Sequence, residues 1–513
     1  MRISILIERM FNRTTSAQLI LTTTIFTLVI VTLSTVVCVP ASSARLSVTL
    51  LLTKQKQLTG KAKHQRRAVT SPSKKKLQRN RRTYRPQRRI KSTSINSQTA
   101  AIRSVTIVRD SLLVPGIIYR MLDVTLADSA HAIVHAVTCV VRNPRYSIDL
   151  VPSRDRIGGL ESVPAIAMRL DTTFNRDVLV AINASFWRAG TNIPIGVTVC
   201  GGEIVSNRAA QWYTLWLDRR YRPWFDSSYI ETKLILSNGT AYPIEAINCN
   251  ATSDTLVMYN RWAGDSIPIR SFMLDSMNMT VDAGLIVQLD TLDPVPTPRE
   301  RSTIVATEYR NWYAHLCRRK ILLRYLRPPA INSTTPCLVL AVRDSGAVEV
   351  PLRGCIVSLP SHHPLATAIN AGDTVLLSTR TRMNDSIEFH VAVSGSPLLL
   401  RQGAIKPHLE DTTKRGSPFI EQRLARTAVG TDAIQSVLYL IAVEKLPNKS
   451  VGMSLRELAQ FLRRFGAYEA INFDGGGSTT MVVGRTCVVP ADVQRYRPVA
   501  NSIVVWRRKV SSR

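Results

Sequence analysis

The residues of this chain that best suit a chemical role form one short run near the C-terminus, Asp474-Gly475-Gly476-Gly477-Ser478-Thr479. Apolar segments precede and follow the run. Three successive glycines cost conformational entropy and add no side chain to a core, so they suit a sharp turn or close contact with a ligand. The carboxylate before them and the hydroxyls after them could act on such a ligand. The same residues could also form a hairpin turn that Asp474 caps.

The segment just upstream favours the functional interpretation. Ser454-Leu455-Arg456-Glu457 has the serine and the glutamate of a capping box. Apolar residues recur at helical spacing from Leu455 to Phe465, and Gly466 stands where a helix commonly ends. We therefore predict a helix, a short loop and then the strand that carries Asp474. A carboxylate and a glycine loop at the end of such a strand commonly form part of a ligand crevice.

Further motifs occur in a fixed order along the chain. They read A-I-N-A-S-F-W at 181–187, P-I-G at 194–196, G-G-E-I at 201–204, V-M-Y-N-R-W-A-G at 257–264, S-G-S-P-L-L-L-R-Q-G at 394–403, R-T-A-V-G at 426–430 and R-Y-R-P-V-A-N at 495–501. Together with D-G-G-G-S-T-T-M-V, this ordered set resembles the phosphodiester glycosidase family. The resemblance covers residues 105–508.

The resemblance implies a hydrolase that cleaves a glycosyl phosphodiester at the glycosidic bond. That reaction passes through an oxocarbenium-like state, which needs a carboxylate near the anomeric carbon and cationic or N–H donors on the departing phosphate. We predict Asp474 as the carboxylate, acting as nucleophile, base or electrostatic stabiliser. Arg426 is the predicted phosphate ligand, although a structural ion pair would also explain it. The predicted substrate-binding loop comprises Gly475, Gly476, Gly477, Ser478 and Thr479, and the N–H groups of Gly475 to Ser478 could form a phosphate cradle.

Five other positions complete the predicted site. Asn183 would orient substrate hydroxyls or hold the aspartate loop, and a lone asparagine at a strand end also suits a plain turn. Gly395 and Ser396 would line the pocket. Arg497 would reach the phosphate or pair with a surface acid, and Glu444 would be a second carboxylate. The sequence pattern demands no metal and no cofactor.

Some positions depart from the family's pattern. Ala184 and Ser185 follow Asn183 where relatives often have two glycines, so close backbone approach is less free there. Residues 443–446 read V-E-K-L in place of V-D-G-R, which loses an aspartate and an arginine. Ala425 replaces a proline. These departures leave an alternative open, a catalytically inactive carbohydrate- or wall-binding protein. A phosphodiesterase that cuts the P–O bond is a further alternative.

The net charge of +31 suggests a nucleic-acid-binding protein at first sight, but its distribution does not. No Asp or Glu occurs between Arg9 and Arg109, and lysines and arginines crowd residues 54–91. We predict that residues 45–104 form a basic disordered linker, because they contain few large apolar side chains. The linker could contact an anionic polymer or a membrane surface, or simply be solvated. One aromatic residue, Tyr84, interrupts the run, so base stacking is not expected.

The first 44 residues predict export. Basic residues precede an apolar stretch from Leu19 to Val39, and small residues up to Ala44 follow it. This pattern is typical of a secretory signal peptide, although the stretch is also long enough for a membrane anchor. We therefore expect a secreted, periplasmic or cell-envelope protein. Seven scattered cysteines would remain after cleavage, and some of them could form disulfides. For any single cysteine, a role as a small buried apolar residue is also expected.

Strand signals dominate the remaining sequence. Short runs rich in apolar and β-branched residues lie at 177–182, 233–236, 337–342 and 436–443. Helical spacing is clear at 455–465 and weaker at 163–170. We predict one α+β domain over residues 105–508, with a mixed, strand-rich sheet and a few covering helices. Residues 296–336 contain five prolines and look like an extension of that domain.

Overall fold

The computed structural model describes residues 101–188, 191–207, 212–250, 254–269, 298–383, 385–410, 418–490 and 496–509. The chain divides into two compact units, Met1–Thr93 and Ser94–Arg513, and every element below belongs to the second unit. The predicted signal segment at 1–44 lies outside the described residues, as does the predicted basic linker up to residue 100. The predicted domain boundaries therefore stay a prediction.

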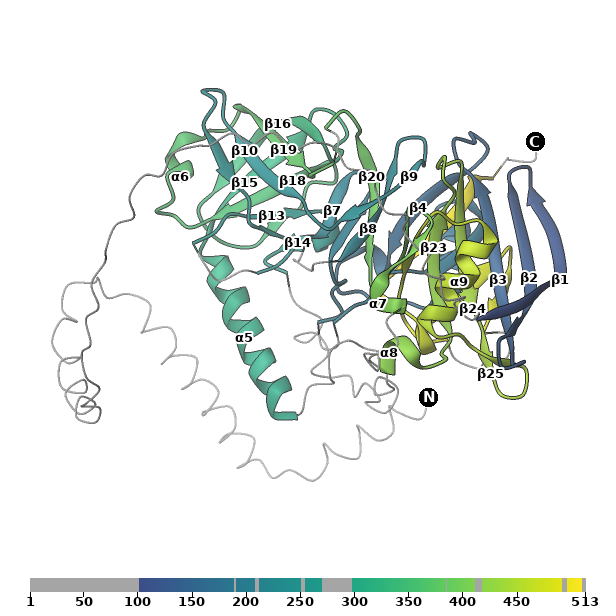
Figure 1. Ribbon diagram of the computed structural model, residues 1–513. Helices are drawn as coiled ribbons and strands as arrows, with labels where there is room; N and C mark the ends of the chain where they lie inside the picture. Colours follow the sequence, from purple (N-terminus) through teal and green to yellow (C-terminus); the bar gives the residue numbers. More distant parts are fainter. Residues whose placement is uncertain are drawn as a thin grey trace, which may run out of the picture. The chain divides into compact units, whose positions relative to one another are not determined.

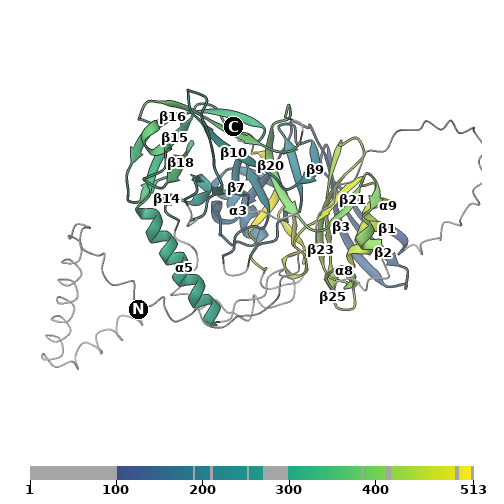
Figure 2. The ribbon, with the colours of Figure 1, turned by 60° about the vertical axis from the view of Figure 1, so that its left-hand side comes forward.

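An eight-stranded antiparallel sheet carries the aspartate loop (Figure 1). Its strand order is β1-β2-β3-β24-β23-β27-β21-β22, and Asp474 follows β27. Helix α9 lies against one face of this sheet in both ribbon views (Figures 1 and 2). The strands are β1 Ile102–Val114, β2 Ile117–Leu126, β3 His131–Val140, β24 Val437–Val443, β23 Arg426–Thr431, β27 Glu469–Asn472, β21 Leu398–Arg401 and β22 Ala404–Ile405.

Two five-stranded antiparallel sheets pack with the first sheet. A shared cluster of buried side chains draws on all three, including Val137 from the first sheet, Val180 from the second and Leu215 from the third. One five-stranded sheet contains β29 Thr486–Val489, β28 Met481–Val483, β5 Arg176–Asn183, β30 Asn501–Arg508 and β4 Ser147–Pro152. The other contains β7 Glu203–Asn207, β6 Val197–Cys200, β20 Phe389–Gly395, β8 Tyr213–Asp218 and β9 Pro223–Ser227.

A second eight-stranded sheet adjoins the β6–β20 sheet through its own buried cluster, which includes Trp216, Phe389, Leu234 and Ile321. Its strands are β11 Ala241–Pro243, β10 Glu231–Ile235, β19 Thr374–Arg380, β16 Ser333–Arg343, β15 Arg319–Tyr325, β18 Gly354–Leu359, β13 Val257–Asn260 and β12 Ala246–Ile247. Small two-stranded sheets pair β14 Ser266–Ile267 with β17 Val348–Glu349 and β25 Lys445–Leu446 with β26 Ser450–Val451.

The strand-rich α+β class is thus confirmed, but the prediction of one mixed sheet is corrected. The described strands divide among several sheets, and their pairings are antiparallel apart from β12 with β13. Most sheet partners are distant in sequence. The helices are α3 Val163–Thr173, α5 Pro298–Leu316, α6 Leu365–Ala368, α7 Pro407–Glu410, α8 Pro418–Glu421 and α9 Leu455–Phe465, with 3₁₀ turns at Ser153–Asp155, Arg261–Ala263 and Gly476–Ser478.

Helix α9 confirms the local reading of the sequence. The Ser454 hydroxyl accepts the Glu457 N–H, and the Glu457 carboxylate accepts the Ser454 N–H, so both halves of the capping box are present. Gly466 ends the helix in the left-handed conformation, with φ 107°. Leu458 and Leu462 are buried against the first sheet. The helix therefore fixes the short turn that leads into β27.

The prediction that residues 296–336 extend the domain is corrected for residues 319–336. Helix α5 occupies part of this range, and β15 and the start of β16 are inner strands of the second eight-stranded sheet. Lys320 is fully buried beside the end of α5, where its ammonium donates to the carbonyls of His315, Leu316 and Arg318. Burial and the neighbouring Arg318 lower the pKa of Lys320 to about 8. Residues 319–336 therefore belong to the second eight-stranded sheet, whereas most described side chains of α5 are exposed.

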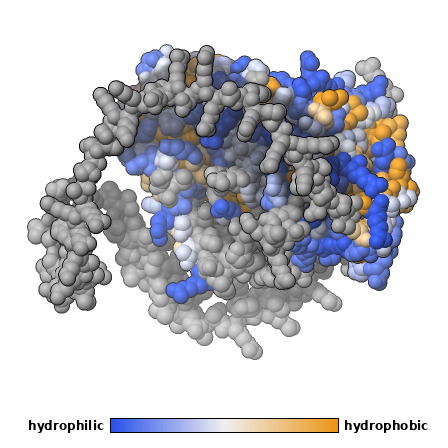
Figure 3. All heavy atoms as spheres, in the orientation of Figure 1, coloured by the Kyte–Doolittle hydropathy of each residue, from blue (hydrophilic) through white to orange (hydrophobic). Residues whose placement is uncertain are grey.

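Several surface and buried features complete the description. Apolar side chains gather over the β1–β2 edge (Figure 3), where Ile107 and Leu112 are more than half exposed. Cys139 and Cys355 are buried thiols, and burial raises the pKa of Cys139 to about 12, so an apolar role suits them. Between residues 101 and 509, the described helices lack the combined length and apolar character of a membrane-spanning helix.

Candidate functional site

Asn183 holds the aspartate loop from the neighbouring sheet. It is fully buried at the end of β5, and its amide nitrogen donates to the Asp474 carbonyl at 2.7 Å. Its amide oxygen accepts the Thr427 hydroxyl at 2.9 Å and the Thr480 N–H at 3.0 Å. The Asp474 N–H donates to the Ala184 carbonyl at 3.0 Å. The geometry thus gives Asn183 the loop-holding role, one of the roles that its sequence position suggested.

Arg426 lies beside the aspartate loop. Strands β23 and β27 pair Ala428 with Asn472, and the Phe473 N–H donates to the Thr427 carbonyl at 2.8 Å. The same antiparallel register brings Asp474 level with Arg426. A side chain at Gly475 would approach the Arg426 Cα and Cδ atoms to 3.8 Å. The structure therefore brings the predicted carboxylate and the predicted phosphate ligand together.

The guanidinium of Arg426 is committed to the protein's own backbone. Its Nε donates to the Met453 carbonyl at 3.0 Å, and Nη2 donates to the carbonyls of Phe419 and Gln422 at 2.8 Å each. The Phe419 ring lies 5.2 Å from the guanidinium carbon. Because the side chain is 1% exposed, these contacts fix it in place. Arg426 thereby ties β23 to the segments before α9 and around α8.

The three glycines form a tight turn rather than an open cradle. Gly476 has φ 54°, a left-handed conformation that glycine adopts without strain. The Gly476 N–H donates to the Ala425 carbonyl at 2.8 Å, and the Ser478 N–H donates to the Gly475 carbonyl at 3.0 Å. Two of the four N–H groups predicted to bind phosphate are therefore used within the protein.

Two buried polar atoms next to the loop have no hydrogen-bond partner among the described residues, the hydroxyl of Ser478 and the amide oxygen of Asn472. Ser478 is fully buried and Asn472 is 1% exposed. Leaving such groups unsatisfied costs free energy, so their position favours a polar ligand or water at this point. Thr479 is also buried, 3.4 Å from the Thr427 hydroxyl. Asn472 was missed as a site residue, although it stands only two residues before Asp474.

Arg497 lies over the middle of the loop. A side chain at Gly477 would come within 3.3 Å of the Arg497 Nη1 atom. The Arg497 side chain is half-buried and makes no ion pair with any described carboxylate. The alternative of a surface ion pair is therefore not seen among these residues. Arg426 donates to backbone carbonyls, whereas Arg497, the other predicted phosphate ligand, makes no ion pair with the described carboxylates.

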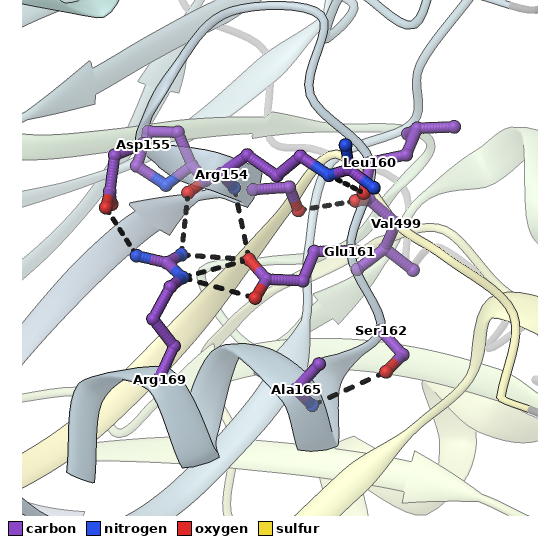
Figure 4. A network of polar contacts seen from close by, with 10 residues as sticks. Arg154, Asp155, Leu160, Glu161, Ser162, Ala165, Arg169 and Val499 are labelled. Carbon is purple, nitrogen blue, oxygen red and sulfur yellow. Dashed lines mark hydrogen bonds and ion pairs between the residues drawn. The ribbon is translucent and has the colours of Figure 1, made fainter. Parts of the chain in front are cut away.

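A polar network holds the segment that carries Arg497 (Figure 4). Arg169 on α3 bonds Glu161 at 2.9 Å and Asp155 at 2.5 Å. Glu161 in turn pairs with Val499 through backbone bonds of 2.9 and 3.2 Å, and the Ser153 hydroxyl donates to the Val499 carbonyl at 2.6 Å. Val499 lies two residues after Arg497, so the network limits where that guanidinium can sit.

Gly395 and Ser396 form the floor beneath β27. A side chain at Gly395 would lie 2.4 Å from the Asn472 carbonyl oxygen and 2.6 Å from a Phe473 ring carbon. Only glycine permits this approach. The Ser396 carbonyl accepts the Asn472 amide at 2.7 Å, and the Pro397 carbonyl accepts the Asn472 N–H at 3.1 Å. Both predicted residues therefore meet the loop through its preceding strand.

Glu444 is buried next to His135, with 3.8 Å between its Oε2 and the histidine Nε2. The register pairs Val443 with Arg426, and side chains alternate along a strand, so Glu444 and Arg426 point to opposite faces of the sheet. His135 Nδ1 lies 2.9 Å from the Tyr119 hydroxyl. Burial raises the pKa of Tyr119, and the Glu444 carboxylate adds to this. Glu444 stays a predicted second carboxylate, and its place favours a positioning role.

The departures from the family's motifs are accommodated locally. Asn501 donates through its amide to the Ser185 hydroxyl at 2.7 Å and accepts the Ser185 N–H at 3.0 Å. Both residues are buried. Ala425 keeps the carbonyl that receives the Gly476 N–H. These substitutions therefore leave the loop's backbone contacts in place.

Aromatic side chains line the approach from α8. Phe186 packs edge-on against Trp212 with 5.5 Å between ring centres, and against Phe419 at 6.3 Å. Trp212 and Phe419 are each partly exposed. Such rings offer an apolar face close to the polar loop. Sequence reasoning missed Trp212 and Phe419, because neither stands in a recognisable motif.

Comparison with known proteins shows which family the C-terminal part of this chain is similar to. Residues 343–506 match the family model described as phosphodiester glycosidase. The predicted resemblance to phosphodiester glycosidases is therefore confirmed. The matched range contains Asp474, Arg426, Arg497 and Gly395, whereas Asn183 lies outside it.

Two of the curated proteins that this chain is similar to share one name. The N-acetylglucosamine-1-phosphodiester alpha-N-acetylglucosaminidase of Bos taurus is 35% identical over 121 residues, or 22% of this chain and 23% of the bovine protein. The Homo sapiens protein of that name is 31% identical over 121 residues, again 22% of this chain and 23% of the human protein. The match thus spans less than a quarter of each relative.

A solved structure shares the fold over a longer range. A hypothetical protein from Synechocystis superposes with a TM-score of 0.50 and 19% sequence identity. The superposition covers 79% of this chain and 64% of that chain. At this identity the likeness shows the fold alone.

Proposed function

We propose that this chain is a hydrolase that cleaves a glycosyl phosphodiester at the bond between the anomeric carbon and the phosphate oxygen. The aspartate loop carries the proposal: Asp474 and its three glycines are held by Asn183 and lie beside Arg426 and Arg497. The family match over residues 343–506 supports it. We further propose that residues 1–44 direct export and that residues 105–508 form a single catalytic domain.

The roles follow from the contacts. Asp474 supplies the carboxylate that the oxocarbenium-like state needs. Arg497 binds the phosphate, because its guanidinium lies over Gly477 without a described carboxylate partner. Arg426 acts as a positioning residue, since backbone carbonyls hold it. The Ser478 hydroxyl and the Asn472 amide oxygen are available to substrate hydroxyls or to the attacking water.

Turnover of a panel of glycosyl phosphodiesters by the full chain tests the proposal. We expect Asp474→Asn to lower kcat/KM by on the order of 10³-fold and Arg497→Gln by about 10²-fold, because each removes charge stabilisation of the transition state. Arg485→Gln, an exposed arginine two residues beyond β28, is the matched control and should retain wild-type activity. Hydrolysis in ¹⁸O-labelled water should place the label on the sugar.

Three results would contradict the proposal. Equal activity in wild type and Asp474→Asn would remove the assignment of the site. If the folded wild-type chain turned over no member of the panel, a carbohydrate- or wall-binding protein without catalysis would replace the hydrolase. Label on the phosphate would instead indicate a phosphodiesterase that cuts the P–O bond.

A further inference from the structure

A shallow pocket of about 480 Å³ opens where the β8–β9 turn meets the segment before β20. Half of its lining residues are arginines, drawn from two separate stretches of chain. One follows β3 and the other is the β8–β9 turn. The arginines are Arg142, Arg219, Arg220 and Arg222, and the remaining lining residues are Asp218, Ser386, Ile387 and Glu388.

The two carboxylates of the pocket are already engaged. Glu388 accepts the Arg219 guanidinium at 2.9 Å. Asp218 accepts the backbone N–H groups of Arg220 and Arg222 at 2.8 and 3.0 Å, which fixes the turn. Four guanidiniums therefore face two acids, and the lining carries a net charge of +2.

The turn presents its arginines in a fixed arrangement. Tyr221 stands between them in the left-handed conformation, with φ 61°, and packs against the core shared by three sheets. The Arg142 N–H donates to the Arg220 carbonyl at 2.9 Å, which joins the two stretches of chain. The Arg222 guanidinium lies 4.7 Å from the centre of the Trp224 ring. A ligand would therefore meet guanidiniums whose backbones are already held in place.

Arg222 also lacks an acceptor. Its Nε atom is enclosed and has no hydrogen-bond partner among the described residues. A guanidinium has only donors, so this N–H can be satisfied only by an acceptor from outside the described protein. An oxyanion in the pocket would offer acceptors to the exposed Arg142 and Arg220, and a small movement of the Arg222 side chain would bring its Nε–H to the same oxyanion.

The pocket is separate from the aspartate loop. Phe389, the first residue of β20, pairs with Asp218 at the pocket, and Gly395, its last residue, packs against Asn472. The strand is seven residues long, counting both ends, so the pocket and the loop lie about 20 Å apart along it. Neither site supplies residues to the other.

We propose that this arginine pocket is an anion site that binds a phosphate group, with the planar forks of Arg220 and Arg222 as its main ligands. Free phosphate and a phosphodiester within a polyol- or sugar-phosphate glycan both present non-bridging phosphate oxygens to the pocket. The proposal stands independently of the hydrolytic function, because none of its residues belongs to the aspartate loop.

Isothermal titration of the full chain at constant ionic strength tests the site, with inorganic phosphate as one probe and poly(glycerol phosphate) as the other. Arg220→Gln/Arg222→Gln should weaken binding at least about tenfold. The matched control is Arg324→Gln/Arg353→Gln, which removes two exposed arginines from the second eight-stranded sheet and its adjoining turn and changes the net charge equally. The basic residues 54–91 are present in every variant, so their contribution cancels.

A second variant guards against misfolding. Arg142→Gln/Arg220→Gln replaces exposed side chains and should also weaken binding about tenfold, with an unchanged thermal midpoint. Tighter binding of the polymer than of inorganic phosphate, lost in the pocket variants, would support the glycan source, and equal binding per phosphate would support free phosphate. Equal affinity in pocket and control variants, or no saturable binding of either probe by wild type, would overturn the proposal.

Discussion

Replacing Gly395 by alanine tests the contact between β20 and β27 on which the position of Asp474 depends. The added methyl carbon would lie 2.4 Å from the Asn472 carbonyl oxygen, 2.5 Å from Ile471 Cγ2 and 2.6 Å from Phe473 Cδ1. Carbon atoms pack at about 3.5 to 4.0 Å, so each contact is short by about 1 Å. All three neighbours are buried parts of β27 or of the residue that follows it, and none can swing into solvent.

We expect Gly395→Ala to lower the free energy of unfolding by about 3 kcal/mol, the upper part of the range for overpacked cores. Relief of the clash requires β27 to shift by about 1 Å, and Asp474 moves with it. A displacement of that size costs on the order of 10²-fold in catalysis. Urea unfolding followed by circular dichroism measures the first effect, and kcat/KM for a glycosyl phosphodiester measures the second.

Two other glycines provide matched controls with the same added methyl group. At Gly430 the methyl would lie 2.9 Å from the Glu469 carbonyl, so its cost should be intermediate. At Gly477 it would meet only the flexible end of Arg497 at 3.3 Å, and stability should change by less than about 0.5 kcal/mol. If Gly395→Ala were as stable as Gly477→Ala, the close packing of β20 on β27 would be refuted.

The remaining predictions concern a buried asparagine, an arginine network and a buried lysine. Asn183→Ala leaves the Asp474 carbonyl and the Thr480 N–H unsatisfied and should cost about 2–4 kcal/mol in urea unfolding. Asn370→Ala should have almost no effect, because this exposed side chain makes no hydrogen bond to the described residues. Arg169→Met breaks the network of Figure 4 and should cost about 1–3 kcal/mol, whereas Arg456→Met, which breaks the more exposed pair with Glu421, should cost less than about 1 kcal/mol. The pKa of Lys320 is lowered to about 8 in the folded state, so the unfolded chain keeps the lysine proton to a higher pH than the folded chain does. The free energy of unfolding therefore rises with pH once the folded lysine has lost that proton. Relative to Lys320→Met, the wild-type free energy of unfolding should therefore rise by about 2 kcal/mol between pH 8 and pH 10, and a flat difference would contradict the assignment.

Local signals predicted the elements around the aspartate loop well. The capping box and Gly466 fixed both ends of α9, because these signals act over a few residues. The apolar runs at 177–182 and 436–443 became β5 and β24 with ends within one residue. Such apolar runs indicate a strand that is buried on both faces, whichever strand it pairs with.

Sheet membership could not be predicted in the same way. Strand β5 pairs with β28 and β30, which follow it by about 300 residues, and no local pattern specifies that choice. Helix α5 was missed because its sequence carries no apolar stripe, as the exposed Tyr309 and Tyr313 show. Prolines led residues 296–336 to be read as an extension, although Pro336 lies inside β16.

At the candidate site too, the sequence indicated which residues take part but not which partners they bind. The motifs named Asp474, Arg426, Arg497 and Asn183, and the structure places them around one loop, whereas their chemical roles stay predictions. The partners of each side chain could not be deduced from the motifs. Arg426 bonds to backbone carbonyls. Thr427 anchors Asn183, although the sequence analysis included Thr427 in a motif without giving it a role.

The aspartate loop sits where three sheets converge. Strands β5, β20 and β27 end there, while β23 and β30 begin there, and each contributes a hydrogen bond or a close packing contact to the loop or to a neighbour of it. The position of Asp474 is therefore set by the relative packing of whole sheets rather than by its own loop. It follows that core substitutions between the sheets should impair the site before they unfold the chain, because a displacement of about 1 Å already costs on the order of 10²-fold in catalysis.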